Sequence, residues 1–249
     1  MTQVHVLGEV VSTNDELRRL AERGAPAGTV VLAESQTGGR GRRGRGWYSP
    51  AGDGLYISVL LRPRNEGHPA TRWTLAAGLA AYRARRALGA AGASVKWPND
   101  VLANRRKLAG TLAELRWSDG RPELVIGTGF NVRQGPRDFP GALSERATSL
   151  RQCVDGPTPE REALAAHYLA VLFEIAERLE LGDWDPVRLE WERSAPESRS
   201  RPVRVTGADG ASWVGVTRGI DRSGALRVER ADGETVSIHH VDSVRAVEE

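Results

Sequence analysis

Apolar and polar side chains alternate along this chain with two different spacings, one helical and one extended. Helical spacing, with apolar residues three and four positions apart, occurs over residues 70–88, 159–181 and 185–193. A further helix is predicted after Ser12, because Thr13 and Glu16 have the spacing of a capping box and Gly24 provides a stop. These segments are the predicted helices of the chain.

Extended segments lie between the predicted helices. Runs rich in β-branched and other apolar residues occur at 29–34, 55–61, 94–97, 107–117 and 123–132. The turn-like residues 103–106 separate a short run at 101–102 from the run at 107–117, which predicts a hairpin. Residues 135–158 are rich in proline and glycine and predict loops. Helices and strands are therefore both expected before Pro196.

The composition changes after Pro196. Short β-rich runs follow, separated by turn signals at Asp209-Gly210, Ser223-Gly224 and Asp232-Gly233. Short strands with such turns are typical of a small β-barrel, here over residues 202–249. A boundary near 196–201 is therefore predicted, with a larger unit at 1–198 and a smaller one at 199–249.

The composition supports a folded, soluble protein. The chain has 249 residues, of which 40% are hydrophobic and 27% charged, which allows a substantial core and is unlike a disordered segment. Its formal net charge of +3 is too small for a protein that coats nucleic acid. No apolar run approaches the roughly 20 residues of a membrane span, and the N-terminus lacks the features of a signal peptide.

Cysteine and histidine are scarce. Cys153 is the only cysteine in the sequence, so an intrachain disulfide is excluded, and no Cys/His spacing matches a zinc site. The adjacent His239 and His240 would point to opposite faces of a strand, which is unsuited to chelation. A reducing, cytoplasmic location without membrane attachment is therefore expected.

Lysine is nearly absent from this basic chain. Of the 35 basic residues, only Lys96 and Lys107 are lysine. Lysine presents a compact point charge on a flexible stem, whereas arginine presents a planar fork, so the two are not interchangeable at a binding site. Two lysines in an arginine-rich chain therefore point to a functional ammonium, with chance survival as the alternative.

The segment GGRGRRGRGW at 38–47 concentrates arginine among glycines. Its arginines are Arg40, Arg42, Arg43 and Arg45. Gly39, Gly41 and Gly44 match G-x-G-x-x-G, but the residues that follow cannot form the helix that a dinucleotide-binding fold requires. Three interpretations stay open: a solvated basic loop, a nucleic-acid contact, or a wrap whose backbone N–H groups and guanidiniums enclose phosphate.

Further motifs carry candidate chemistry. KWPND at 96–100 places a cation, an aromatic ring and a carboxylate at the end of a strand. RKLAG at 106–110 puts Lys107 at a strand start, and GTGFN at 127–131 ends a strand with closely spaced glycines. Each motif alone is also explained without function, as an edge-strand turn, a solvent-facing lysine or a bulge. Their combination in this order is not.

Together these segments resemble the biotin protein ligase family. The resemblance rests on Ser12-Thr13-Asn14, GRGRRGRGW, KWPND, KLAGTLAE and IGTGFNV, continues into RGIDRSGAL and spans nearly the whole chain. It implies an α+β fold: a core like that of class II aminoacyl-tRNA synthetases, with a mixed sheet flanked by helices, and a small SH3-like barrel. It also implies a ligase that uses MgATP to form biotinyl-5′-AMP and transfers biotin to one lysine of a biotin carboxyl carrier domain.

The resemblance also implies roles for individual residues. The biotin-binding set would be Ser12, Thr13, Asn14, Gln36, Gly39, Arg40, Lys107 and Gly110. The nucleotide-binding set would be Arg42, Arg43, Arg45, Trp47, Lys107 and Asn131. Lys107 would bridge the biotin carboxyl group and the α-phosphate, Arg42 would reach the phosphates, and Asp100 would position the acceptor lysine. Trp47 and Trp97 would pack rather than react, and no residue is assigned to Mg²⁺.

The sequence departs from the family pattern in two places. Relatives that act as repressors carry an N-terminal helix-turn-helix domain, whereas Ser12-Thr13-Asn14 lies close to the first residue here, so operator binding is not expected. In the last strand His240-Val241-Asp242 replaces the Gly-acid-apolar pattern of relatives, and Arg245 would be a nucleotide contact. The alternative functions are a lipoate–protein ligase, which shares the core fold, and a nucleic-acid-binding module that uses the Arg/Gly segment.

Overall fold

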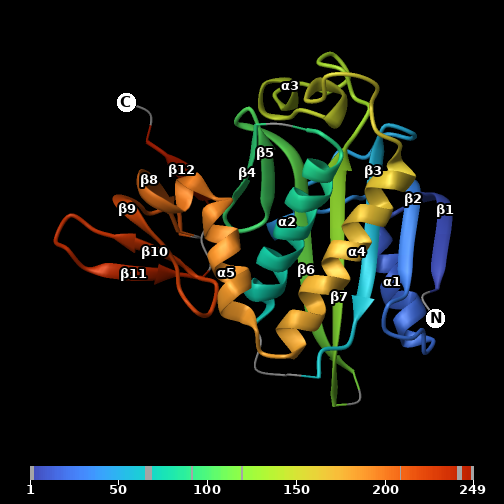
Figure 1. Ribbon diagram of the computed structural model, residues 1–249, viewed down its shortest axis with the longest axis horizontal. Helices are drawn as coiled ribbons and strands as arrows, with labels where there is room; N and C mark the ends of the chain where they lie inside the picture. Colours follow the sequence, from blue (N-terminus) through green and yellow to red (C-terminus); the bar gives the residue numbers. More distant parts are fainter. Residues whose placement is uncertain are drawn as a thin grey trace.

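The large sheet of the molecule is mixed. The computed structural model (Figure 1) describes residues 3–64, 69–90, 92–118, 120–207, 209–239 and 243–247. Its seven-stranded sheet has the order β1-β2-β3-β7-β6-β5-β4, with β1 and β2 parallel and the other neighbours antiparallel. The strands are β1 (Val4–Val10), β2 (Val30–Gln36), β3 (Gly54–Leu61), β4 (Ala93–Lys96), β5 (Asp100–Ala103), β6 (Arg106–Ser118) and β7 (Arg121–Asn131).

Helices cover both faces of this sheet. Figure 1 shows α2 (Ala70–Ala87) and α4 (Arg161–Glu180) crossing one face, where they bury the main hydrophobic core with β3, β6 and β7. The other face is covered by α1 (Thr13–Glu22), whose Leu17 packs with Val31 of β2, while the neighbouring Val30 faces the main core. The remaining helical segments are η1 (Arg42–Gly44), α3 (Leu143–Arg146), η2 (Leu150–Gln152), α5 (Trp184–Arg193) and η3 (Pro196–Ser198).

The C-terminal part forms a second, antiparallel sheet. Its strands are β8 (Arg199–Thr206), β9 (Ser212–Ile220), β10 (Leu226–Glu229), β11 (Thr235–Ile238) and β12 (Ser243–Ala246). Their order is β11-β10-β9-β8-β12, and Figure 1 shows them beside α5 and the β4 end of the large sheet. The expected α+β fold class, with a β-rich C-terminal part, is confirmed. The division at 198 and 199 stays a prediction, because Val203 and Ile220 share one continuous core with α2 and α4.

The start of the chain differs from the sequence-based expectation in two ways. Strand β1 was not predicted, because its alternating side chains are largely exposed at the sheet edge and Val6 is 71% exposed. The predicted capping box is wrong: Ser12 is the N-cap of α1, and no side chain caps the helix. The Thr13 hydroxyl donates instead to Gln36 Oε1 at 3.2 Å, because it belongs to a polar network around the nearby pocket.

Candidate active site

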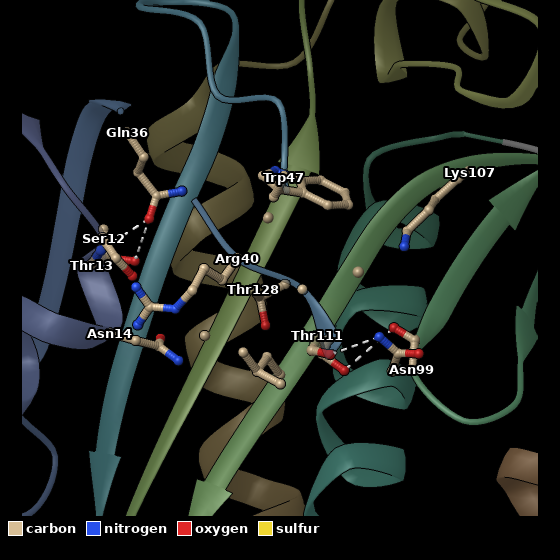
Figure 2. A pocket seen from close by; sticks show the side chains of 15 residues that line it. Ser12, Thr13, Asn14, Gln36, Arg40, Trp47, Asn99, Lys107, Thr111 and Thr128 are labelled. Atoms are coloured by element: carbon tan, nitrogen blue, oxygen red, sulfur yellow. Dashed lines mark hydrogen bonds between the residues drawn. The ribbon is translucent and has the colours of Figure 1, made fainter. Parts of the chain in front are cut away.

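The pocket in Figure 2, here called the inner pocket, lies where the N-terminus of α1 meets strands β2, β6 and β7. Its cavity volume is about 40 Å³. Its walls come from segments far apart in the sequence, which only the sheet order brings together. The lining residues are Ser12, Thr13, Asn14, Gln36, Arg40, Gly41, Trp47, Asn99, Lys107, Gly110, Thr111, Leu112, Gly127, Thr128 and Gly129.

One end of the inner pocket is a buried network of hydroxyl and amide groups. Gln36 Oε1 accepts from the Thr13 backbone N–H at 2.9 Å, and the Gln36 amide donates to Ser49 Oγ at 2.9 Å. The Ser58 hydroxyl bridges Thr13 Oγ1 and Asn14 Oδ1 at 2.7 Å and 2.6 Å. Since these groups are buried, or half-buried in the case of Gln36, and hydrogen-bonded to one another, their orientations are fixed before any ligand arrives. This end therefore suits a compact polar ligand group.

Charged side chains continue this network to the arginine and glycine segment. Asn14 donates to Glu114 at 2.6 Å, and Glu114 is paired with Arg18. Arg18 also pairs with Asp15. Asp15 in turn accepts hydrogen bonds from the two terminal guanidinium nitrogens of Arg40 at 2.6 Å and 2.8 Å. The hydrogen bond from Arg40 holds the pKa of Asp15 below its ordinary value despite partial burial. The chain's own carboxylate at Asp15 therefore helps to hold the arginine and glycine segment in place.

Glycines of β7 make the floor of the inner pocket flat. A Cβ at Gly127 would lie 2.2 Å from Asn14 Oδ1, and one at Gly129 would lie 2.3 Å from Trp47 Nε1. Both strands that flank β7 pair with it in regular register, so the glycines do not mark a bulge. They leave room for the Asn14 and Trp47 side chains to lie directly on the sheet.

Lys107 stands at the other end of the inner pocket. Its ammonium lies 2.7 Å from Asp100 Oδ1 and 5.2 Å from the centre of the Trp47 ring. The side chain folds back over Gly110, where a Cβ would lie 3.0 Å from Lys107 Cε. Figure 2 shows the ammonium directed toward the pocket that Trp47 walls. Lys107 is 35% exposed in its side chain, so a ligand can reach its charge.

A second cavity, the outer pocket, adjoins the first at Trp47 and Lys107 and is lined mostly by apolar groups. Asn131 contributes to its wall, but the Asn131 amide already donates to the backbone oxygens of Lys107 at 3.2 Å and Thr148 at 2.9 Å. The amide therefore fastens the loop after α3 to β6. The lining residues are Gly46, Trp47, Tyr48, Lys107, Asn131, Phe139, Leu143, Arg146 and Ala147.

A third cavity, the basic pocket, adjoins the inner pocket at Asn99. Burial, together with the neighbouring charge of Arg43, lowers the pKa of Arg42, which faces this cavity. A guanidinium whose pKa is lowered by burial and by a neighbouring cation favours an anionic ligand, because the ligand's charge offsets both effects. The lining residues are Arg42, Arg45, Lys96, Trp97, Pro98, Asn99, Asp100, Ser243, Val244 and Arg245.

Comparison with known proteins identifies the family of this chain. Residues 7–131 match the Biotin/lipoate A/B protein ligase family, and residues 201–243 match the Biotin protein ligase C terminal domain. The chain belongs to the biotin protein ligase family. A biotin--[acetyl-CoA-carboxylase] ligase from Mycobacterium tuberculosis is 35% identical and aligns over 97% of this chain and 88% of its own length. A bifunctional ligase/repressor BirA from Bacillus subtilis is 34% identical over 89% of this chain and 68% of its own length.

Solved biotin protein ligases share the whole fold. The enzyme from Aquifex aeolicus in complex with biotin and ATP has a TM-score of 0.84 at 29% identity, over 98% of this chain and 99% of that chain. The enzyme from Leishmania major in complex with biotinyl-5-AMP has a TM-score of 0.61 at 28% identity, over 96% of this chain and 99% of that chain. The resemblance inferred from the motifs is therefore confirmed at the level of family and fold.

The residues predicted for a biotin protein ligase site divide among the three cavities. Of the biotin set, all but Gly39 line the inner pocket, and the Gly39 carbonyl accepts the Trp47 backbone N–H at 2.8 Å. Of the nucleotide set, Trp47, Lys107 and Asn131 line the outer pocket, while Arg42 and Arg45 face the basic pocket with Asp100. Arg43 is exposed and lines none of the three cavities. The binding roles of these residues stay predictions.

Several residues of the site were not predicted from the sequence. Asn99, Glu114 and Thr128 lie inside quoted motifs, whereas Asp15 enters only through the contacts of the folded chain. The walls of the outer pocket at Phe139 and from Leu143 to Ala147 come from the loop-rich stretch, which carries no motif. They reach the site because α3 lies beside the start of β6.

The remaining sequence predictions concern metals and membranes. Within the residues described here, no group of three acidic, cysteine or histidine side chains could hold a metal ion. None of the helices in the same residues is both long and apolar enough to cross a bilayer. His239 is exposed, whereas the predictions for His240 and the His240-Val241-Asp242 segment fall outside the described residues.

Proposed function

We propose that this chain is an ATP-dependent ligase that converts biotin to biotinyl-5′-AMP and transfers biotin to a lysine of a biotin carboxyl carrier domain. The observation that carries the proposal is the place of Lys107. Its ammonium lies where the inner and outer pockets meet, in contact with Asp100 of the basic pocket. A group in this place can contact an acid in the inner pocket and a nucleotide that spans the other two.

The first step joins two anions. The carboxylate of biotin, whose ring system would occupy the polar end near Thr13 and Gln36, attacks the α-phosphorus of ATP. A carboxylate–phosphorus bond forms, the bond to the β-phosphate breaks and pyrophosphate leaves. Lys107 offsets the repulsion between the reactants, and Arg42 and Arg45 stabilise the charge on the phosphate oxygens. The adenine base of ATP would lie against Trp47 in the apolar outer pocket.

The second step consumes the mixed anhydride. The neutral amine of the acceptor lysine attacks the acyl carbon, an amide bond forms and AMP leaves. Asp100 is the carboxylate available at the boundary of the pockets, and we propose that it orients the incoming amine and accepts its proton. Closure of the arginine and glycine segment by Arg40 and Asp15 would keep water from the labile adenylate.

Mg²⁺ is proposed as part of the nucleotide substrate. Among the residues that the structure describes, Asp100 is the single carboxylate that lines the basic pocket, and it is paired with Lys107. That donor set does not form a cage of protein ligands, and Mg²⁺ in nucleotide sites is commonly held by phosphates with few carboxylates. No step is assigned to the metal here. The single cysteine Cys153 also fits our proposal that the reaction takes place in the cytoplasm.

An adenylation assay tests the proposed function. The protein is incubated with MgATP and either biotin or lipoate, and the acyl-AMP formed is measured by mass spectrometry. We expect biotinyl-AMP, and a thermal stabilisation by biotin with ATP that exceeds the sum of the separate ligands. Lipoyl-AMP without biotinyl-AMP would overturn the assignment of substrate. Salt-sensitive binding to nucleic acid with no adenylate formed would instead favour the nucleic-acid-binding alternative.

A further inference from the structure

A hydrogen bond of a buried tryptophan joins the KWPND turn to the C-terminal sheet. The Trp97 ring is buried, at 7% exposure, and its Nε1–H donates to the backbone oxygen of Gly224 at 3.0 Å. Gly224 lies in the turn between β9 and β10, with φ at +88°, and a Cβ there would lie 2.9 Å from Leu75 Cδ1 of α2. The turn is therefore inserted between α2 and the KWPND segment, at a place where only glycine fits.

The turn that carries Gly224 is rigid. Asp221 Oδ1 accepts from the backbone N–H groups of Ser223 and Ala225 at 2.8 Å and 3.0 Å and from the Ser223 hydroxyl at 2.6 Å. Its other oxygen accepts from the Ser237 hydroxyl of β11 at 2.8 Å. Because one carboxylate fixes both sides of the turn, the Gly224 oxygen has a defined position. These contacts explain the conformation of the RGIDRSGAL motif.

The opposite side of the KWPND turn is hydrogen-bonded to β6 of the seven-stranded sheet. The Asn99 amide donates to the Thr111 backbone oxygen at 3.0 Å, and the Thr111 backbone N–H donates to the Asn99 oxygen at 2.9 Å. Figure 2 shows this pair at the edge of the inner pocket. Asp100, the next residue, begins β5 and pairs with Lys107. The turn is thus held from two sides, and the carboxylate that contacts Lys107 follows it directly.

We infer that Trp97 is a positioning residue, through which the Asp221–Ala225 turn of the C-terminal sheet fixes the place of Asp100 and, through it, of Lys107. The inference rests on the proposed function of Lys107 and extends it to the C-terminal sheet. Loss of the Trp97 hydrogen bond removes the directional contact with the C-terminal sheet and leaves the hydrogen bonds on the Asn99 side in place. The ion pair between Asp100 and Lys107 then samples more arrangements, and fewer of them place the ammonium between the reactants.

Replacement of Trp97 by phenylalanine tests this inference, because Trp97→Phe keeps a buried ring and removes the donor. The matched control is Trp184→Phe: Trp184 is 4% exposed, and its buried Nε1–H has no hydrogen-bond partner among the described residues. We expect Trp97→Phe to lower kcat of biotin-dependent ATP–pyrophosphate exchange by about tenfold to a hundredfold. The KM for biotin should stay within about twofold, because the polar end of the inner pocket is untouched. Trp184→Phe should keep the parental kcat.

A second variant and a second measurement separate positioning from stability. Asp221→Asn weakens the turn without touching the site, and we expect it to lower kcat in the same direction as Trp97→Phe. Hydrogen exchange at the Thr111 amide should be about tenfold faster in Trp97→Phe and unchanged in Trp184→Phe. This measurement tests the inference even if the parent protein forms no adenylate, an outcome that would overturn the proposed function alone. Parental kcat and parental Thr111 exchange in Trp97→Phe, or losses in both tryptophan variants alike, would overturn the inference.

Discussion

At the scale of single residues, several candidate site residues already form hydrogen bonds or ion pairs within the protein. The Asn131 amide is occupied by two backbone oxygens, so the residue shapes the outer pocket more than it offers a donor. Lys107 differs, because its ammonium has one carboxylate partner and a partly exposed surface between the inner and outer pockets. Among the candidate residues, Lys107 is therefore the one whose charge is best placed to act on a ligand.

We predict that Lys107→Ala lowers the rate of biotinyl-AMP formation by about a hundredfold to a thousandfold, as expected when one stabilising charge is removed from a transition state. The fold should persist, because Lys107 is not part of the hydrophobic core. Single-turnover adenylation and the melting temperature are the measurements. Arg116→Ala is the control, since Arg116 is an exposed cation further along the same strand. Adenylation within twofold of the parent rate in Lys107→Ala would remove this residue from the catalytic assignment.

At the scale of elements, strand β7 forms the floor of the inner pocket and the arginine and glycine segment forms its cover. Strand β7 supplies a floor on which Trp47 and Asn14 rest, and the segment from Gly38 to Trp47 closes over it. The segment is fastened by its own bridge between Arg40 and Gly46 and by the ion pair to α1. The inner pocket thus requires both a strand without side chains at Gly127 and Gly129 and an attached loop, and each requirement can be tested alone.

Gly129→Ala is expected to displace Trp47, because the new methyl group would lie 2.3 Å from the indole nitrogen. We predict weaker binding of biotin, measured by calorimetry, with a folded protein. The contrasting variant is Gly78→Ala in α2, where a Cβ meets nothing within 4 Å and the helical backbone is retained. It should stabilise the protein by about 0.5–1 kcal/mol and leave binding unchanged. Equal biotin affinities for the parent and Gly129→Ala would contradict the proposed role of the floor.

The attachment of the loop predicts a pH dependence. The Arg40 hydrogen bond keeps the pKa of Asp15 below its ordinary value of 3.8, so the ionised carboxylate stabilises the folded chain above that pH. This contribution, at most about 1 kcal/mol for a partly exposed pair, disappears as pH falls through the lowered pKa. The unfolding free energy of Asp15→Asn should therefore fall less steeply below pH 5 than that of the parent. Parallel pH profiles for the two proteins would show that the pair does not stabilise the loop.

At the scale of the whole molecule, the two sheets share one hydrophobic core, and a buried carboxylate of α5 contacts the C-terminal sheet. Glu192 of α5 is 9% exposed and accepts the Ile220 backbone N–H of β9 at 2.8 Å. It also pairs with Arg199 of β8 at 2.9 Å and with Arg188 at 3.4 Å. Together with the contact between Trp97 and Gly224, these interactions join the C-terminal sheet to the rest of the chain. The two parts are therefore expected to unfold together.

We predict that Glu192→Ala lowers the free energy of unfolding by about 2 kcal/mol, because it leaves the buried Ile220 N–H without an acceptor and removes the carboxylate partner of Arg199. The exposed pair between Arg230 and Glu234 provides the comparison, and Glu234→Ala should cost about 1 kcal/mol or less. Scanning calorimetry of the parent should give a single transition. Two separated transitions, or equal costs for the two variants, would contradict the shared core.

The sequence by itself determined the family and most of the elements, because periodicity and turn residues act locally and the motifs keep their spacing along the chain. It also singled out Lys107 and the polar residues near Ser12 as candidate site residues, whose roles stay predictions. The tertiary structure decided what those motifs contact. Pairing of strands that are distant in sequence set Lys107 against Asp100 and Trp47, and the C-terminal turn against Trp97. Such contacts depend on sheet order and packing, which no local pattern specifies, and this is also why the exposed edge strand β1 escaped prediction.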